Sequence, residues 1–247
     1  MSGQQQYDEI GEAYEGFKAL PLEQYAVVPS FLGMVGDVDG RSVLDLACGT
    51  GFYSRELRRR GAADVLGVDI SGEMVAVADQ LEKEQPLGVR YEVGDVAELR
   101  HLGRRFDIAL AVQLLNYAPD VATTERMCRN VRRHLRPGGE LFALNQSPDY
   151  RFDGPTPDKY GFRTELTGVA VETGAQVRTT ALLDPPVSFV ANLPRRDVYE
   201  KCLTAAGFSD VTWVPLTVSE AGVREFGADH WADFHANPPL EMLRCRA

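Results

Sequence analysis

The sequence predicts an α/β fold with a doubly wound, mostly parallel sheet of seven strands. Short apolar segments alternate with helical segments over the first 146 residues, a period-two pattern follows to about residue 194, and the strand and helix alternation then returns. Parallel strands need crossover connections, so this alternation indicates helices on both faces of one sheet. We expect one domain over residues 1–247, with an N-terminal helical lid (1–35), a core (40–146), an inserted antiparallel cap (147–194) and a C-terminal completion of the sheet (195–247).

The strands expected in the core are short and apolar, and each is followed by a turn or a helix. Gly61 is placed to end the first core helix, and Ser71 is a suitable N-cap for the second. We expect core strands over 42–47, 64–70, 89–96, 106–114 and 138–146. We expect core helices over 53–61, 71–84 and 120–136.

The remaining elements follow from a change of period. The stretch "VAVETGAQVRTTALLDPPVSFVANL" alternates with period two, which is typical of antiparallel strands. The pattern then predicts a helix over 195–206 that ends at Gly207, a strand over 211–218, a helical stretch over 219–235 and a last strand over 240–247. These strands extend the main sheet.

Charge and composition restrict the partners. A formal net charge of −10 disfavours a nucleic-acid substrate, which is normally bound through clustered Lys and Arg. The basic cluster at 55–61 suits the solvated face of a helix. There is no apolar run long enough to span a membrane and no leader pattern at the N-terminus, so we expect no membrane partner and a cytoplasmic location.

The four cysteines indicate neither a disulfide framework nor a metal site. They are far apart in the sequence, with no C-x-x-C pair and no histidine at metal-ligand spacing. We expect reduced thiols and no bound metal. These cysteines are Cys48, Cys128, Cys202 and Cys245.

The loop "DLACGTGF" follows the first strand, where open α/β sheets bind ligands. Gly49 and Gly51 let a ligand approach the backbone, and Asp69 ends the next strand, where a carboxylate can accept both hydroxyls of a ribose. A dinucleotide and a cationic nucleoside both contain such a ribose. The acidic Asp45 and Asp95, with Ser54 at the third glycine position of a dinucleotide loop, favour the cationic ligand.

The segments "VLDLACGTG", "GVDIS", "GDV" and "LRPGG" resemble the successive motifs of the class I S-adenosylmethionine-dependent methyltransferases. The resemblance implies the Rossmann-like methyltransferase fold and S-adenosylmethionine as the cofactor, with S-adenosylhomocysteine as its product. Ala47 stands where many members carry the first glycine. The cofactor residues that the resemblance implies are Ala47, Gly49 and Gly51 for the methionyl part, Asp69 for the ribose, and Met74, Asp95 and Val96 for the adenine. Ile70 is a further candidate cofactor contact.

Three further segments, "YDEIGEAYEGFKALPL", "LDLACGTGFYSRELRRRGAADVLGVDISGEM" and "LLNYA", resemble the toxoflavin-type (7-azapteridine) N-methyltransferases. This resemblance implies methyl transfer to a ring nitrogen of a small heteroaromatic metabolite in secondary-metabolite biosynthesis. It also implies that the N-terminal segment covers the cofactor, with Tyr7 or Tyr14 in contact with cofactor or substrate. The helical spacing of Tyr7, Ile10, Tyr14 and Phe17 equally fits an amphipathic helix packed on the sheet.

Candidate acceptor contacts follow the fourth strand and lie in the last helical stretch. Gln113, Asn116 and Tyr117 lie where the fourth strand ends, so they face the reaction centre, with Gln113 also a candidate cofactor contact. Trp231 and His235 fall at helical spacing and could form a flat wall and a polar anchor, although an aromatic helix face is more often core.

The expected reaction is in-line displacement, in which the protein supplies alignment and exclusion of water. No catalytic residue is certain, and Tyr14 and His235 are the candidates if a general base is needed. An O- or C-methyltransferase of another small molecule, a ribose-cofactor oxidoreductase and a catalytically silent cofactor-binding module remain alternatives. The acceptor, the number of methyl groups and the oligomeric state, monomer or homodimer, stay open.

Overall fold

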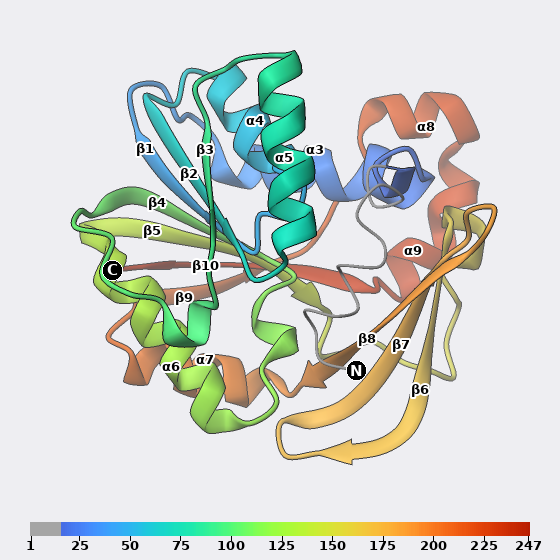
Figure 1. The fold of residues 1–247 in the computed structure, drawn as a ribbon. Helices are drawn as coiled ribbons and strands as arrows, with labels where there is room; N and C mark the ends of the chain where they lie inside the picture. Colours follow the sequence, from blue (N-terminus) through green and yellow to red (C-terminus); the bar gives the residue numbers. More distant parts are fainter. Residues whose placement is uncertain (1–15) are drawn as a thin grey trace.

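The structure is a computed structural model, and it describes residues 16–247. Its main sheet has seven strands in the order β3-β2-β1-β4-β5-β10-β9 (Figure 1). All neighbouring strands are parallel except β10, which is antiparallel to both β5 and β9. The strands are β1 (Ser42–Leu46), β2 (Asp64–Asp69), β3 (Arg90–Val93), β4 (Phe106–Val112), β5 (Leu135–Gln146), β9 (Ser209–Val214) and β10 (Leu240–Arg246). The predicted doubly wound sheet is confirmed.

Helices cover both faces of this sheet, with α3, α4 and α5 on one face and α6 and α7 on the other (Figure 1). Two of the starts are fixed by side-chain caps: Ser71 Oγ accepts from the amide of Met74 at 3.2 Å, and Asp120 Oδ1 accepts from the amide of Thr123 at 2.7 Å. The helices are α3 (Val28–Val35), α4 (Phe52–Arg59), α5 (Gly72–Glu84), α6 (Val121–His134) and α7 (Arg196–Ala205).

Alternation along each strand divides the core into two layers. Val43 and Ile108 point to the side of α3 and α4, whereas Leu44 and Ala109 point to the side of α6 and α7. Both faces of the central strands are therefore buried, which explains why these strands read as continuous apolar segments.

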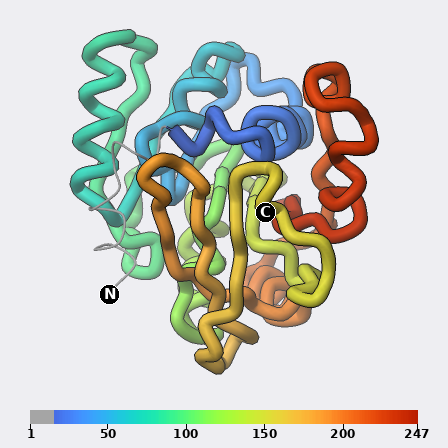
Figure 2. The backbone as a smooth tube through the Cα atoms, turned by 90° about the vertical axis from the view of Figure 1, so that its right-hand side faces the viewer, coloured from blue at the N-terminus to red at the C-terminus, as the bar shows by residue number. Residues whose placement is uncertain are grey.

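A second, antiparallel sheet of three strands lies within the expected cap segment. It consists of β6 (Phe162–Val171), β7 (Gly174–Ala181) and β8 (Val187–Pro194), in that order. Figure 2 shows these strands side by side, with the N-terminal helical segment along one end and the last helical segments at one side. The second sheet thus stands beside the carboxyl ends of the main strands.

The helical stretch predicted over 219–235 is broken into three pieces. Gly227 has φ +82, a left-handed conformation that ends α8 (Glu220–Phe226). The chain continues through a 3₁₀ turn, η5 (Ala228–Trp231), into α9 (Ala232–Ala236). The break lets Trp231 turn into the core.

The described part of the predicted lid is helical. A π-helical turn, η1 (Glu23–Val27), leads directly into α3, and Ala26, Val27 and Phe31 are fully buried. The backbone of Tyr25 accepts a hydrogen bond from the amide of Ser219 at 2.8 Å, which ties this segment to the start of α8. Tyr7 and Tyr14 lie outside the described residues.

Candidate functional site

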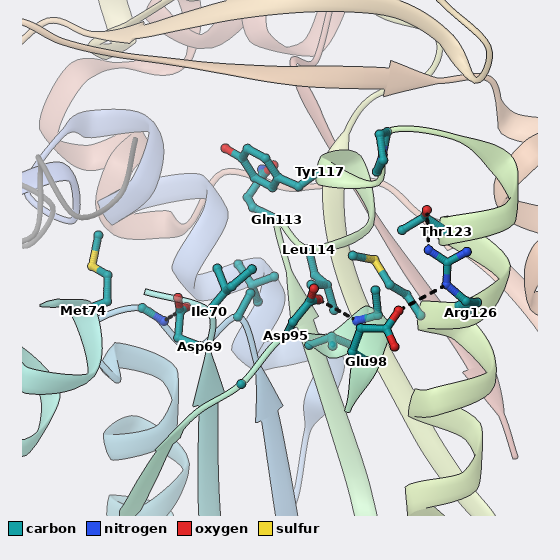
Figure 3. Close-up of a pocket in the computed structure, with 18 residues that line it drawn as sticks. Asp69, Ile70, Met74, Asp95, Glu98, Gln113, Leu114, Tyr117, Thr123 and Arg126 are labelled. Carbon is teal, nitrogen blue, oxygen red and sulfur yellow. Dashed lines mark hydrogen bonds and ion pairs between the residues drawn. The ribbon is translucent and has the colours of Figure 1, made fainter. Parts of the chain in front are cut away.

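A cavity of about 370 Å³ opens at the carboxyl ends of β1, β2, β3 and β4 and against the start of α6 (Figure 3). This is the edge at which open α/β sheets bind their ligands, and the volume lies within the range of small-molecule sites. Most of the expected cofactor residues line it, namely Ala47, Gly49, Asp69, Ile70, Met74, Asp95, Val96 and Gln113.

Asp69 ends β2 and is held by backbone amides. Its Oδ2 accepts from the amide of Gly49 at 2.8 Å, and its Oδ1 accepts from the amide of Ser71 at 2.9 Å. The side chain is buried yet lines the cavity. A carboxylate oxygen offers two lone-pair positions, so a backbone amide and a ligand hydroxyl can share one oxygen.

The loop after β1 brings its backbone to the cavity through left-handed residues. Ala47 has φ +59 and Gly49 has φ +54. This conformation is routine for glycine, whereas a Cβ in it costs about 1–2 kcal/mol. The departure at Ala47 noted in the sequence therefore introduces local backbone strain at the wall of the cavity.

Gly51, the other glycine predicted to contact the ligand, is not among the residues that line the cavity. It is buried at the N-cap of α4 with φ +79, and a Cβ there would collide with the ring and hydroxyl of Tyr91. Packing against β3 leaves no room for a side chain at this position. A glycine needed for close packing and one needed for ligand approach look alike in a sequence, so packing alone accounts for the glycine here.

Asp45 lies under the loop in a fully buried position. Burial raises the pKa of its carboxyl to about 6, while the hydroxyl of Ser54, which donates to Oδ2 at 2.6 Å, opposes that rise and the charge of Asp69 adds to it. Cys48, next along the loop, is also buried, and burial raises the pKa of its thiol well above the usual value. This thiol is therefore not a thiolate nucleophile.

Acidic groups outnumber basic ones around the cavity. Asp69, Asp95 and Glu98 line it together with one cation, Arg126, whose Nε lies 3.8 Å from Glu98 Oε1. Asp95 also caps the turn that follows β3, because its Oδ1 accepts from the amide of Ala97 at 2.8 Å. An acid-rich lining favours a ligand with net positive charge over a pyrophosphate.

Gln113 and Tyr117 lie at one end of the cavity, away from Asp95 and Glu98 (Figure 3). Gln113 follows β4 in a left-handed conformation, with φ +53. Asn116 is fully buried and does not line the cavity, and its Nδ2 donates to Gln113 Oε1 at 3.0 Å. Asn116 thus orients Gln113, and the acceptor contact predicted for Asn116 has no counterpart in the lining of this cavity.

A second, smaller cavity of about 50 Å³ lies between the N-terminal segment, the end of β5 and the second sheet. Its wall combines three phenylalanine rings with a few polar groups. Among the described residues, Gln113 is the one that lines both cavities. The lining residues are Phe17, Leu22, Glu23, Gln113, Gln146, Phe162, Thr164, Thr179, Phe189, Pro239 and Leu240.

Trp231 and His235 line neither cavity, so the structure does not support the predicted substrate contacts. Trp231 is fully buried, stacks on Tyr160 with ring centroids 4.9 Å apart, and donates from Nε1 to the backbone oxygen of Gly222 at 3.1 Å. His235 is exposed on α9. The aromatic spacing over α9 therefore marks core packing, which is the commoner meaning of such a pattern.

Sequence reasoning missed residues of both cavities. Gln146 was detectable, because a polar residue at the carboxyl end of a buried strand faces the ligand edge. Glu23 carried no signal, since it reaches the second cavity only through the packing of the N-terminal segment. Other residues of the first cavity that were missed are Gly94, Ala97, Glu98, Val112, Leu114, Pro119, Thr123, Arg126 and Met127.

No helix within 16–247 has the length and apolar character needed to cross a membrane. Within the same residues, no group of three or more histidine, cysteine or acidic side chains is arranged to hold a metal ion.

The similarity to a known family covers the lining of the first cavity but not that of the second. Residues 43–139 match the family model described as "Methyltransferase domain". Every residue that lines the first cavity lies inside this segment, whereas Gln113 is the one residue of the second cavity that does. The match therefore bears on the first cavity and carries almost no information about the second.

Among curated proteins, a ubiquinone biosynthesis O-methyltransferase of Coxiella burnetii is 38% identical over 103 residues. The match covers 42% of this chain and 42% of that protein, so the chain spans less than half the length of this relative.

Solved structures match over nearly the whole chain. An S-adenosylmethionine-dependent methyltransferase from Mesorhizobium loti has a TM-score of 0.65 and 23% identity, covering 94% of this chain and all of that one. The CcbJ methyltransferase of Streptomyces caelestis has a TM-score of 0.66 and 18% identity, covering 98% of each chain. Residues 43–139 are therefore similar to a methyltransferase domain, and the chain has the fold of the S-adenosylmethionine-dependent methyltransferases.

Proposed function

We propose that this protein transfers a methyl group from S-adenosylmethionine to a ring nitrogen of a small heteroaromatic metabolite, with a 7-azapteridine of the toxoflavin type as the acceptor. The observation that carries the cofactor assignment is the first cavity. It lies wholly within the matched methyltransferase segment and presents Asp69 at the end of β2.

The residues around this cavity fit the cofactor. The backbone at Ala47 and Gly49 suits the methionyl part, Asp69 the ribose, and Met74 with Asp95 the adenine. The acidic lining matches the positive charge of a sulfonium ligand. When bound, the cofactor supplies an electrophilic methyl group.

In this reaction the protein's own residues align the cofactor and the acceptor. The amides of Gly49 and Ser71 fix the carboxylate of Asp69, and Asn116 fixes the carboxamide of Gln113 at the junction of the two cavities. Preorganised groups of this kind hold the reactants in the correct orientation, which lowers the reaction barrier by roughly 7–11 kcal/mol in well-oriented systems. If deprotonation of the acceptor is needed, Tyr14 is the proposed base, since His235, the other candidate, is exposed on α9 and lines neither cavity.

Calorimetric titration with S-adenosylmethionine and S-adenosylhomocysteine tests the cofactor assignment. We expect binding to wild type that weakens at least tenfold, a loss of about 1.4 kcal/mol, in Asp69→Asn. Asp79→Asn is the matched control, because Asp79 is exposed on α5 and lines neither cavity. Folded wild-type protein that binds neither compound would overturn the proposal.

A second candidate function is O-methylation, which the similarity to ubiquinone biosynthesis O-methyltransferases favours. Mass spectrometry of products from azapteridine and catechol acceptors, incubated with labelled cofactor, distinguishes the two. Label on a ring nitrogen supports the first proposal, and label on a phenolic oxygen supports the second.

A further inference from the structure

The second cavity has flat apolar walls contributed by distant parts of the chain. The rings of Phe17 and Phe189 lie 6.1 Å apart at 25°, and the ring of Phe162 meets Phe17 edge-on at 6.2 Å. Phe17 comes from the N-terminal segment, while Phe162 and Phe189 come from β6 and β8 of the second sheet. Such surfaces favour a planar ring, which offers both a face and an edge.

Glu23 is the one charged residue in the described wall of this cavity. Its Oε2 accepts from Lys18 Nζ at 2.8 Å, and each side chain of this pair is 13% exposed. Within residues 16–247, no other hydrogen bond to the Glu23 carboxylate is present, so Oε1 keeps its capacity to accept. A half-enclosed carboxylate oxygen of this kind binds an N–H donor strongly.

Other polar groups in the wall of this cavity are joined by long hydrogen bonds. Gln146 Nε2 lies 3.4 Å from Thr179 Oγ1, which in turn lies 3.4 Å from Thr164 Oγ1. Hydrogen bonds of this length are weak. Gln146 and Thr179 are nevertheless buried, so this chain can exchange its long internal bonds for bonds to a ligand.

The size of the cavity restricts what enters it. A volume of about 50 Å³ takes one edge of a ring, so the rest of a bicyclic molecule must extend out of the cavity. Lys18 balances the charge of Glu23, so an uncharged edge that donates an N–H to the remaining carboxylate oxygen suits the site better than an anionic edge. The wall therefore selects for an uncharged ring edge with N–H donors.

We propose that the second cavity is the acceptor site, and that it selects a neutral planar heteroaromatic ring through a hydrogen bond from a ring N–H to Glu23. This inference rests on the proposed function, since the acceptor must meet the cofactor. Gln113, which lines both cavities, marks the place where they meet. Residues outside the matched methyltransferase segment then decide which acceptor is used.

A binding experiment with two probes tests this without any turnover. Lumazine is a fluorescent bicyclic ring with N–H donors on its pyrimidine half, and 1,3-dimethyllumazine has the same shape without them. We expect wild type, titrated with S-adenosylhomocysteine present, to bind lumazine at least tenfold more tightly than the dimethyl compound. A hydrogen bond to a charged acceptor contributes about this much.

The Glu23→Leu variant should lose that preference, so that both probes bind equally. Taking the ratio of the two affinities cancels any general effect of the substitution on the cavity. Gln24→Leu, a change at the exposed neighbouring residue, should keep the wild-type ratio. Circular dichroism confirms that each variant is folded.

Three results would overturn the inference: no lumazine binding to folded wild type, equal binding of both probes, or a preference that survives Glu23→Leu. Calorimetry with S-adenosylmethionine on the same samples separates this failure from failure of the proposed function. Cofactor binding without a Glu23-dependent preference overturns the acceptor site alone. Loss of cofactor binding overturns the proposed function itself.

Discussion

Asn116 donates a hydrogen bond of 3.0 Å to the side-chain oxygen of Gln113, so a fully buried amide sets the direction of the one described side chain that reaches both cavities. Gln113 is itself in a left-handed conformation. The residue at the junction is thus held by its backbone and by a neighbour that contacts neither ligand site.

Replacing Asn116 with Ala should separate cofactor binding from methyl transfer. The variant loses one buried hydrogen bond, so we expect about 1–2 kcal/mol less stability in urea unfolding. Cofactor affinity should stay within about threefold, because Asp69 and the loop after β1 are untouched, while transfer to the acceptor falls roughly tenfold as Gln113 loses its orientation. Equal losses in cofactor affinity and transfer would contradict a positioning role.

Replacing Asp45 with Asn should flatten the dependence of stability on pH. The carboxyl has a pKa near 3.8 when unfolded and about 6 in the fold. Between these values the folded protein holds the extra proton, so its free energy of unfolding declines as pH rises from about 4 to 6, by on the order of 3 kcal/mol, and stays lower above pH 6. Urea unfolding at pH 4.5 and 7.5 measures the decline.

The Asp45→Asn variant lacks this titration, so its stability should decline less than that of wild type over the same range. Asp79→Asn removes an exposed carboxyl and should follow the wild-type curve. Parallel curves for wild type and Asp45→Asn would show that Asp45 is charged in the fold at both pH values.

Replacing Ala47 with Gly should stabilise the protein by roughly 0.5–1 kcal/mol. The substitution removes a Cβ from a left-handed conformation, which outweighs the greater entropy that glycine gives the unfolded chain. Ala63→Gly is the control, because Ala63 is exposed and outside the left-handed region, so only the entropy term acts and stability should decline. A loss of stability in both variants would contradict the strain at Ala47.

Replacing Gly51 with Ala should destabilise the protein by about 3 kcal/mol, through collision with Tyr91 and the left-handed backbone. Removing the ring in the same background, with Tyr91→Leu, should recover part of the loss and show coupling between the two positions. Gly33→Ala on α3 meets no atom within 4 Å and should be neutral or slightly stabilising. Thermal unfolding compares the four proteins.

The sequence was sufficient where local rules apply. Asp69 and Met74 were found because a residue at the end of a buried strand, or in the first turn of the next helix, faces the ligand edge whatever the details of packing. The seven-stranded sheet was predicted from the hydrophobic periodicity and from the turn and capping residues between the elements, which are also local features.

The remaining features depend on tertiary packing. Position 51 needs a glycine because the ring of Tyr91, on another strand, occupies the space of a side chain. Trp231 turns into the core where the helical stretch breaks at Gly227. The second cavity combines residues from Phe17 to Leu240, so no local stretch of sequence contains its pattern. Period and spacing report which residues share a face, but they do not report which distant faces meet.

The division of the two cavities between separate stretches of chain also bears on how such a protein can diversify. The second sheet contributes Phe162, Thr164, Thr179 and Phe189 to the second cavity and no residue to the first. Substitutions or exchanged segments in β6–β8 therefore alter the wall of the second cavity, the proposed acceptor site, while leaving the wall around Asp69 intact. The fold is modular in the evolutionary sense: the main sheet can be inherited unchanged while the second sheet accumulates substitutions.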